Sequence, residues 1–226
     1  LDINLKNKAM LISHTHKWIF IHVPKNGGTT ISDVLRPHCD AEGVGPAQYK
    51  NPELEVTGKK RDRYYFQHDT AMQTQSKLNA KGYDYNDYFS FSIVRNPWDR
   101  MVSIWYFFQK LAKAPNPDFT WPVEVIGKCK TFDGLVRSDC FKSPQLSYVE
   151  NCATGDLNVD FVGRLENLQE DFKIICDKIG LPRIELSHRN KTKHKHYTEY
   201  YDDETREIVA EKYARDIEYF GYEFGE

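Results

Sequence analysis

The sequence contains no hydrophobic run long enough to cross a lipid bilayer. Its apolar runs, such as Trp18–Ile21, are only a few residues long, whereas a membrane-spanning helix needs about 20 apolar residues. The amino-terminal residues 1–6 mix charged and apolar side chains and lack the apolar core of a signal peptide. We therefore expect no membrane segment in this chain. Because the first residue is Leu1 rather than Met, a removed leader or anchor stays an open alternative.

The sequence also lacks the Cys-x-x-Cys pattern, and its five cysteines are odd in number. Disulfide-rich secreted domains ordinarily hold an even set of cysteines, and zinc sites commonly use closely paired ones. We therefore expect reduced thiols, as in the cytoplasm. Two disulfides with one spare thiol are the alternative.

A strong excess of either charge is absent as well. Lys and Arg number 31 and Asp and Glu number 33, which gives a net charge of −2. This balance argues against a protein that coats nucleic acid, and we expect no nucleic-acid partner. Hydrophobic residues make up 40% of the chain, which excludes a mainly disordered protein. A local basic pocket for a small polyanion is compatible with this composition.

Short apolar runs alternate with amphipathic stretches, and this alternation predicts an α/β fold with a mainly parallel sheet flanked by helices. No repeat or linker is visible, so we expect a single domain over residues 1–226. The expected strands are residues 17–23, 64–67, 88–94 and 160–163. The expected helices are residues 30–35, 70–80, 96–111, 167–179 and 202–219, with short helices and loops over residues 113–158.

A candidate phosphate site follows the first of these strands. The glycine pair Gly27 and Gly28 lets backbone N–H groups approach a ligand closely, and the helix that begins there has a positive dipole end. Thr29 and Thr30 add hydroxyl donors, and Lys25 adds a cation. An ordinary strand–turn–helix with a threonine N-cap is the alternative.

This segment is not a Walker A loop. That loop needs a Lys directly after its second glycine and then Ser or Thr, whereas Lys25 precedes Gly27 and Gly28. The hydroxyl that would hold Mg²⁺ is therefore missing. A kinase or ATPase is less favoured for that reason.

A second candidate site follows the strand at residues 88–94. Asn96 is a good N-cap, Pro97 suits the first helical position, and Asp99 stands where a reciprocal cap belongs. Arg95 therefore lies at the carboxyl end of a strand, where α/β sheets bind ligands. Ser103 returns to the same helical face as Asn96, so Arg95 and Ser103 can meet at one anion. Alternatively, Arg95 pairs with a nearby carboxylate.

Together the two motifs resemble the sulfotransferases that use 3′-phosphoadenosine 5′-phosphosulfate (PAPS). Residues 161–168 and 187–193 resemble the carbohydrate branch of that family, and the latter segment is similar to the uronyl 2-O-sulfotransferases. The resemblance covers roughly residues 17–225 but is specific only at these four places. It implies a P-loop-like sulfotransferase fold. It also implies an acceptor that carries a hydroxyl group and belongs to the glycans.

The resemblance also implies roles for particular residues. The 5′-phosphosulfate would be held by Lys25, Asn26, Gly27, Gly28, Thr29 and Thr30, and the 3′-phosphate by Arg95 and Ser103. A loop with Lys191 and Thr192 would fold over the nucleotide. This family's first loop often has one small residue where this chain has Asn-Gly-Gly, which leaves the donor geometry open.

His68 is the candidate general base. It follows the expected strand at residues 64–67, and a neutral imidazole can take the proton of an acceptor hydroxyl. The 2-O-sulfotransferases that this chain resembles use a histidine after a comparable strand. Alternatively, His68 caps the next helix or makes a core contact. Asp69 is the second candidate base, although a position just before Thr70 favours an N-cap.

These residues predict a PAPS-dependent O-sulfotransferase that acts without a metal, with Lys25 stabilising the leaving group and His68 as base. A P-loop-like nucleotide kinase or hydrolase, and a non-catalytic module that binds anions or glycans, are the alternatives. We expect a cytoplasmic location. A Golgi-lumen catalytic domain separated from its anchor is the alternative.

Overall fold

The computed structural model describes residues 10–39, 68–113, 120–186 and 195–226. The chain divides into two compact units. Unit 1 comprises Leu1–Val94 and Ser147–His188, and unit 2 comprises Arg95–Leu146 and Arg189–Glu226. The expectation of a single domain over residues 1–226 stays a prediction.

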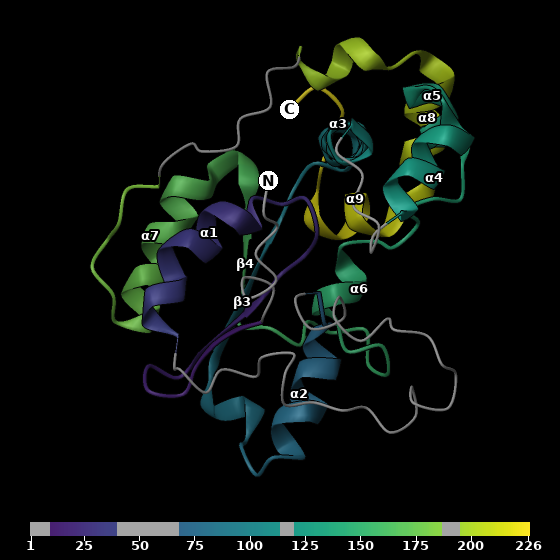
Figure 1. Cartoon of the computed structure of the whole chain (residues 1–226). Helices are drawn as coiled ribbons and strands as arrows, with labels where there is room; N and C mark the ends of the chain where they lie inside the picture. Colours follow the sequence, from purple (N-terminus) through teal and green to yellow (C-terminus); the bar gives the residue numbers. More distant parts are fainter. Residues whose placement is uncertain (1–9, 40–67, 114–119, 187–194) are drawn as a thin grey trace. The chain divides into compact units, whose positions relative to one another are not determined.

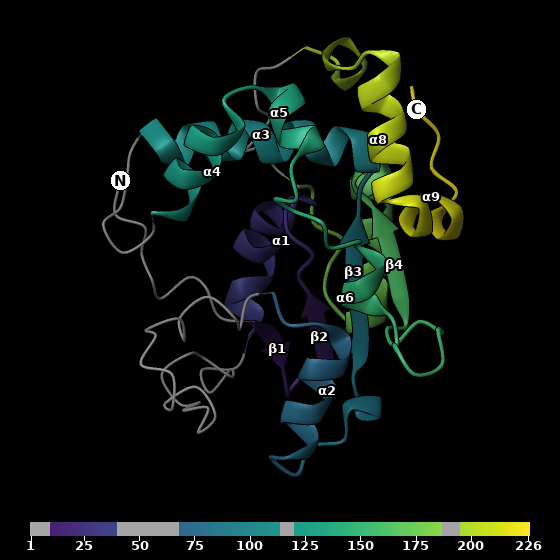
Figure 2. The same cartoon turned by 90° about the vertical axis from the view of Figure 1, so that its right-hand side faces the viewer.

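Unit 1 is built on a four-stranded sheet in the order β1-β2-β3-β4 (Figure 2). The strands are β1 (Leu11–Ser13), β2 (Trp18–Ile21), β3 (Phe89–Val94) and β4 (Phe161–Arg164). Strand β1 pairs antiparallel with β2, whereas β2–β3 and β3–β4 are parallel. The predicted α/β class with a mainly parallel sheet is confirmed. The short strand β1 was not expected, and the expected strand at residues 64–67 lies outside the described residues.

Two helices cover one face of this sheet. Trp18, Phe20 and Phe91 form a core with the buried sides of α1 (Gly28–Leu35) and α7 (Leu168–Ile179). Figure 1 shows α1 and α7 side by side on one side of β3 and β4, and α2 on the other. A loop of residues 22–27 joins the carboxyl end of β2, one of the two inner strands, to the amino terminus of α1.

Helix α2 (Ala71–Asn79) begins with a capping box. The Thr70 side chain accepts a hydrogen bond from the Gln73 N–H, and the Gln73 side chain accepts one from the Thr70 N–H. Thr70, rather than Asp69, is therefore the N-cap, so the N-cap interpretation of Asp69 was wrong. The alternative that His68 caps this helix is also wrong, because Thr70 takes that position.

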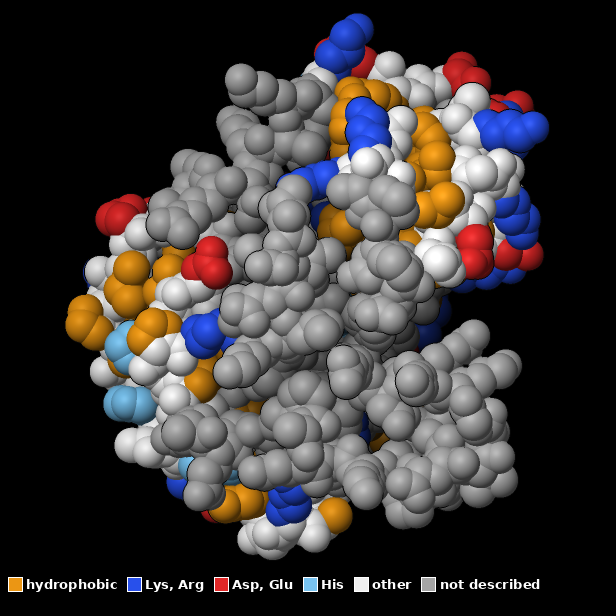
Figure 3. Space-filling view, in the orientation of Figure 1, with side chains coloured by type: hydrophobic (Ala, Val, Ile, Leu, Met, Phe, Trp, Pro, Cys, Tyr) orange, Lys and Arg blue, Asp and Glu red, His pale blue; other side chains and the backbone are white. Residues whose placement is uncertain are grey.

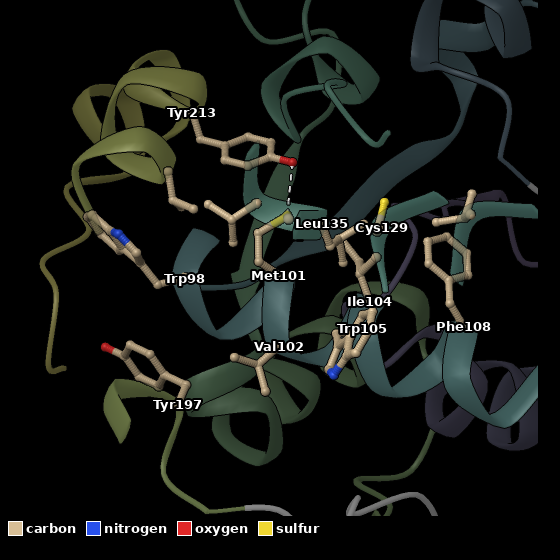
Figure 4. Close-up of a cluster of buried hydrophobic side chains, with 13 residues drawn as sticks. Trp98, Met101, Val102, Ile104, Trp105, Phe108, Cys129, Leu135, Tyr197 and Tyr213 are labelled. Atoms are coloured by element: carbon tan, nitrogen blue, oxygen red, sulfur yellow. Dashed lines mark hydrogen bonds between the residues drawn. The ribbon is translucent and has the colours of Figure 1, made fainter. Parts of the chain in front are cut away.

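Unit 2 is helical, and Figure 4 shows its core. Side chains of α3, among them Trp98, Met101 and Phe108, pack against Leu135 and Tyr213. The helices are α3 (Pro97–Lys113), α4 (Trp121–Cys129), α5 (Phe132–Arg137), α8 (Asp203–Lys212) and α9 (Ala214–Phe220). In the described residues of the chain, the remaining short helices are α6 (Leu146–Val149), η2 (Arg36–His38), η4 (Tyr85–Asp87), η5 (Leu165–Asn167) and η6 (Tyr197–Tyr200).

The last expected helix, residues 202–219, is in fact two helices. Tyr213 leaves the helical conformation, with φ −118° and ψ 26°, and separates α8 from α9. Its buried hydroxyl donates to the carbonyl of Phe141 and lies 3.3 Å from the sulfur of Met101 (Figure 4). The long-range anchoring of Tyr213 explains the break, which helical periodicity alone does not predict.

Part of the surface of unit 2 is hydrophobic. Figure 3 shows orange side chains gathered at the upper right, where Figure 1 labels α4. Exposed large hydrophobic residues of unit 2 include Phe107 on α3 and Trp121 and Val123 on α4. In the described ranges no helix combines the length and the apolarity that crossing a bilayer requires.

Candidate functional site

The loop between β2 and α1 places a helix amino terminus next to a cation. Lys25 and Gly27 both adopt left-handed backbone conformations, with φ of +74° and +76°. Gly27 is the N-cap of α1, and its carbonyl accepts hydrogen bonds from the N–H groups of Thr30 and Ile31 at 2.9 and 3.3 Å. Because glycine has no side chain, this N-cap residue supplies no side-chain hydrogen bond to α1. The alternative of a threonine N-cap was therefore wrong.

Asn26 ties this loop to the sheet. Its side chain is buried, and Nδ2 donates to the carbonyl of Ile93 on β3 at 2.9 Å. This contact fixes the position of the residue between Lys25 and Gly27. A role of Asn26 in cofactor binding stays a prediction.

A histidine for which no role was predicted lies beneath the loop. His22 follows β2, is buried, and stacks on Phe20 with a ring-centroid distance of 5.5 Å. A Cβ atom at position 28 would lie 1.9 Å from Nε2 of His22, so only glycine fits there. Burial, reinforced by the nearby charges of His68 and Lys25, lowers the pKa of His22 well below its usual value. The His22 imidazole is therefore neutral at neutral pH.

We expect Gly28→Ala to destabilise the protein. The added methyl group must displace the His22 ring, and overpacking of this kind costs about 1–3 kcal/mol. Gly127→Ala on α4 is the matched control, because Gly127 is also a glycine within a helix but a Cβ atom added to it would meet nothing within 4 Å. That change should be neutral or stabilise by up to about 1 kcal/mol. Equal urea midpoints for the two variants would contradict the packing of His22 on Gly28.

His68 contacts the same histidine. Its Nδ1 lies 3.0 Å from the backbone carbonyl of His22, and the two imidazole rings meet edge to face at 4.7 Å. A carbonyl can only accept, so Nδ1 of His68 carries the proton and donates. In the neutral ring Nε2 is then the basic nitrogen. A role of His68 as general base stays a prediction.

Asp69, the second candidate base, is paired. Its carboxylate is buried and forms an ion pair with the Lys77 ammonium. Burial raises the pKa of Asp69, although the contact with Lys77 opposes that shift. Because the ammonium already occupies a carboxylate oxygen, Asp69 is less suited than His68 to accept a proton from a substrate.

The second motif lies in unit 2. Asn96 caps α3, as predicted, because its Oδ1 accepts a hydrogen bond from the Trp98 N–H at 3.1 Å. Asp99 pairs with Arg95, whose Nε and Nη2 lie 2.7 and 2.6 Å from Oδ2. This confirms the alternative in which Arg95 pairs with a nearby carboxylate, and a reciprocal cap by Asp99 stays a prediction. Asp99 and Ser103 are one turn apart on α3, and the Ser103 side chain is buried. Binding of one anion by Arg95 and Ser103 together stays a prediction.

Other predicted residues lie outside the described part of the chain. These are Lys191 and Thr192, whose roles stay predictions. Within the described ranges no group of three or more His, Cys, Asp or Glu side chains is arranged to hold a metal ion. The five cysteines, all within those ranges, form no disulfide.

Comparison with known proteins agrees with this geometry. The model of the sulfotransferase family matches residues 8–223. An uncharacterized protein of Archaeoglobus fulgidus is 32% identical over 112 residues, which cover 50% of this chain and 82% of that protein. The family match includes both the loop after β2 and the motif after β3. The chain belongs to the sulfotransferase family.

Proposed function

We propose that this transferase moves a sulfuryl group from PAPS to a hydroxyl group of a carbohydrate. Family membership supports sulfuryl transfer in general. The observation that carries the finer proposal is the amino terminus of α1, whose N-cap residue Gly27 has no side chain and which follows Lys25 in a loop close to His68. An anion that accepts hydrogen bonds from this terminus would take the place of a cap.

The loop after β2 suits a phosphosulfate in its charge and shape. The dipole of α1 favours a negative group at Gly28, and Lys25 adds a full positive charge. The Thr29 and Thr30 hydroxyls are further donors. The tight packing of Gly28 on His22 keeps the start of the helix free of a Cβ atom. We assign the 5′-phosphosulfate to this loop in unit 1.

We assign the 3′-phosphate to Arg95 and Ser103 in unit 2. The Arg95–Asp99 pair aligns the guanidinium along α3, and a bound phosphate would add a second anion to the same group. Lys191 and Thr192 are proposed to cover the nucleotide, as the resemblance implies. The proposal includes no metal ion.

The reaction requires one bond to form as another breaks. The acceptor oxygen bonds to sulfur, and the bond from sulfur to the bridging oxygen of the 5′-phosphate breaks in line. Nε2 of His68 takes the acceptor proton, since Nδ1 is the nitrogen that donates to His22. The Lys25 ammonium neutralises the charge that grows on the bridging oxygen. Both side chains belong to unit 1.

The proposals of a glycan acceptor and a cytoplasmic location rest on features that are less specific than the two phosphate motifs. A glycan acceptor rests on the resemblance of residues 161–168 and 187–193 to the carbohydrate branch. A cytoplasmic location is supported by the five cysteines outside any disulfide, because a reducing compartment maintains thiols.

Nucleotide binding tests this function. We expect isothermal titration to show that 3′,5′-bisphosphoadenosine binds without Mg²⁺ and more tightly than ATP, with or without Mg²⁺. Arg95→Ala should weaken this binding by about 10- to 100-fold, because a hydrogen bond from a charged group is worth about 1.5–3 kcal/mol. Ser103→Ala should weaken it less, since its hydroxyl is neutral.

Two other results would redirect the assignment. Tighter binding of ATP with Mg²⁺ would favour a nucleotide kinase or hydrolase. Binding of the bisphosphate without any turnover of PAPS, over a panel of glycan, peptide and small-alcohol acceptors, would favour a non-catalytic module.

A further inference from the structure

A buried glutamine holds the backbone of Arg95 from both sides. The Arg95 N–H donates to Oε1 of Gln145 at 2.9 Å, and Nε2 of Gln145 donates to the Arg95 carbonyl at 2.7 Å. Arg95 stands between the end of β3 at Val94 and the start of α3 at Pro97. The planar amide of Gln145 thus accepts from and donates to the backbone of Arg95 as a neighbouring strand would.

A buried carboxylate holds Gln145 in turn. The backbone N–H groups of Gln145 and Leu146 donate to the two carboxylate oxygens of Asp216, each at 2.8 Å. Gln145 and Asp216 are both fully buried. Asp216 lies in the first turn of α9, so the carboxyl-terminal part of unit 2 fixes a segment about 70 residues earlier in the chain.

We propose that Gln145 and Asp216 are positioning residues for recognition of the 3′-phosphate. Binding of that phosphate by Arg95 is part of the proposed function, and this inference rests on it. Asp99 holds the Arg95 guanidinium at one end, and the backbone from which the side chain departs sets its other end. Gln145 fixes that backbone at both its N–H and its carbonyl, and Asp216 fixes Gln145. In metal sites, contacts that orient the ligating residues commonly contribute about 10- to 100-fold to affinity for the metal, and we expect a similar effect here.

The test compares two nucleotides that differ in a single group. Isothermal titration measures the affinity for 3′,5′-bisphosphoadenosine and the affinity for adenosine 5′-monophosphate, which lacks the 3′-phosphate. Gln145→Met keeps the volume of the side chain and removes both hydrogen bonds to Arg95. We expect the bisphosphate to bind this variant at least about tenfold more weakly, while the monophosphate binds as it does to the wild type.

Gln169 on α7 offers a matched control in unit 1. Its Nε2 donates to the carbonyl of Ile184 at 3.2 Å, and its Oε1 accepts from the Leu186 N–H at 2.8 Å. Gln169→Met therefore removes the same two kinds of backbone hydrogen bond from residues other than Arg95. It should lower stability but keep the wild-type ratio of the two affinities.

The outcomes separate this inference from the proposed function. If Gln145→Met keeps the wild-type ratio of bisphosphate affinity to monophosphate affinity, the positioning role is overturned and the proposed function is left intact. A wild-type protein that binds the two nucleotides equally would refute the 3′-phosphate site itself. If Gln145→Met does not fold, Asp216→Asn carries the test, because the isosteric amide keeps an acceptor for only one of the two N–H groups. A lowered ratio in that variant supports the inference, and a wild-type ratio overturns it.

Discussion

Lys25→Ala should lower the rate of sulfuryl transfer by about 10²–10³-fold, the usual effect of removing one group that stabilises developing charge. The Lys25 ammonium lies close enough to His22 to disfavour protonation of that ring, which places its charge within the loop. Alanine keeps the Cβ atom, so the strain of the left-handed backbone at φ +74° is the same in both proteins. The change therefore removes the amine without altering the backbone. Single-turnover sulfation with saturating PAPS measures the effect.

Lys130→Ala is the matched control for this variant. Lys130 also has a left-handed backbone, with φ +61°, and it ends α4 rather than lying in the loop after β2. Its removal should leave the rate unchanged. A wild-type rate in folded Lys25→Ala would refute the assignment of Lys25 to the leaving oxygen.

Local sequence features predicted most of the elements around the site. The apolar run before Lys25 became β2, and the glycine pair marked the turn into α1 within two residues of the expected start. Helix α7 ends at Gly180, whose left-handed φ of +70° suits glycine. These features depend on the conformational preferences of neighbouring residues, which a single sequence contains.

Contacts between distant residues were not predictable in the same way. The His22 side chain looks like any polar residue at the end of a buried strand, and only the fold brings it against Gly28 and His68. The hydrogen bonds from Gln145 to Arg95 span 50 residues. No local pattern marks such pairs, since Gln145 and Asp216 both lie in segments that also contain other polar residues.

His68→Asn should fold like the wild type and bind PAPS normally but transfer the sulfuryl group about 10²–10⁴-fold more slowly. The side-chain amide of asparagine stands where Nδ1 of histidine stands, so it can still donate to the His22 carbonyl, which lies 3.0 Å from Nδ1 in the wild type. It has no atom equivalent to the basic Nε2. The variant therefore removes the base while keeping the contact that positions it.

His68→Gln is the complementary variant, because it keeps a polar group at the place of Nε2 and loses the donor at the place of Nδ1. Its amide stands where Nε2 stands, and the contact with His22 is lost. If His68 is only structural, Asn should preserve the rate and Gln should reduce both stability and rate. If His68 is the base, both variants should be slow, and only Gln should be less stable.

A near-normal rate in His68→Asn would transfer the role of base to Asp69, and Asp69→Asn would then be the slow variant. The ion pair with Lys77 argues against that result, because proton transfer to Asp69 would also discharge a buried carboxylate and leave the ammonium without its partner.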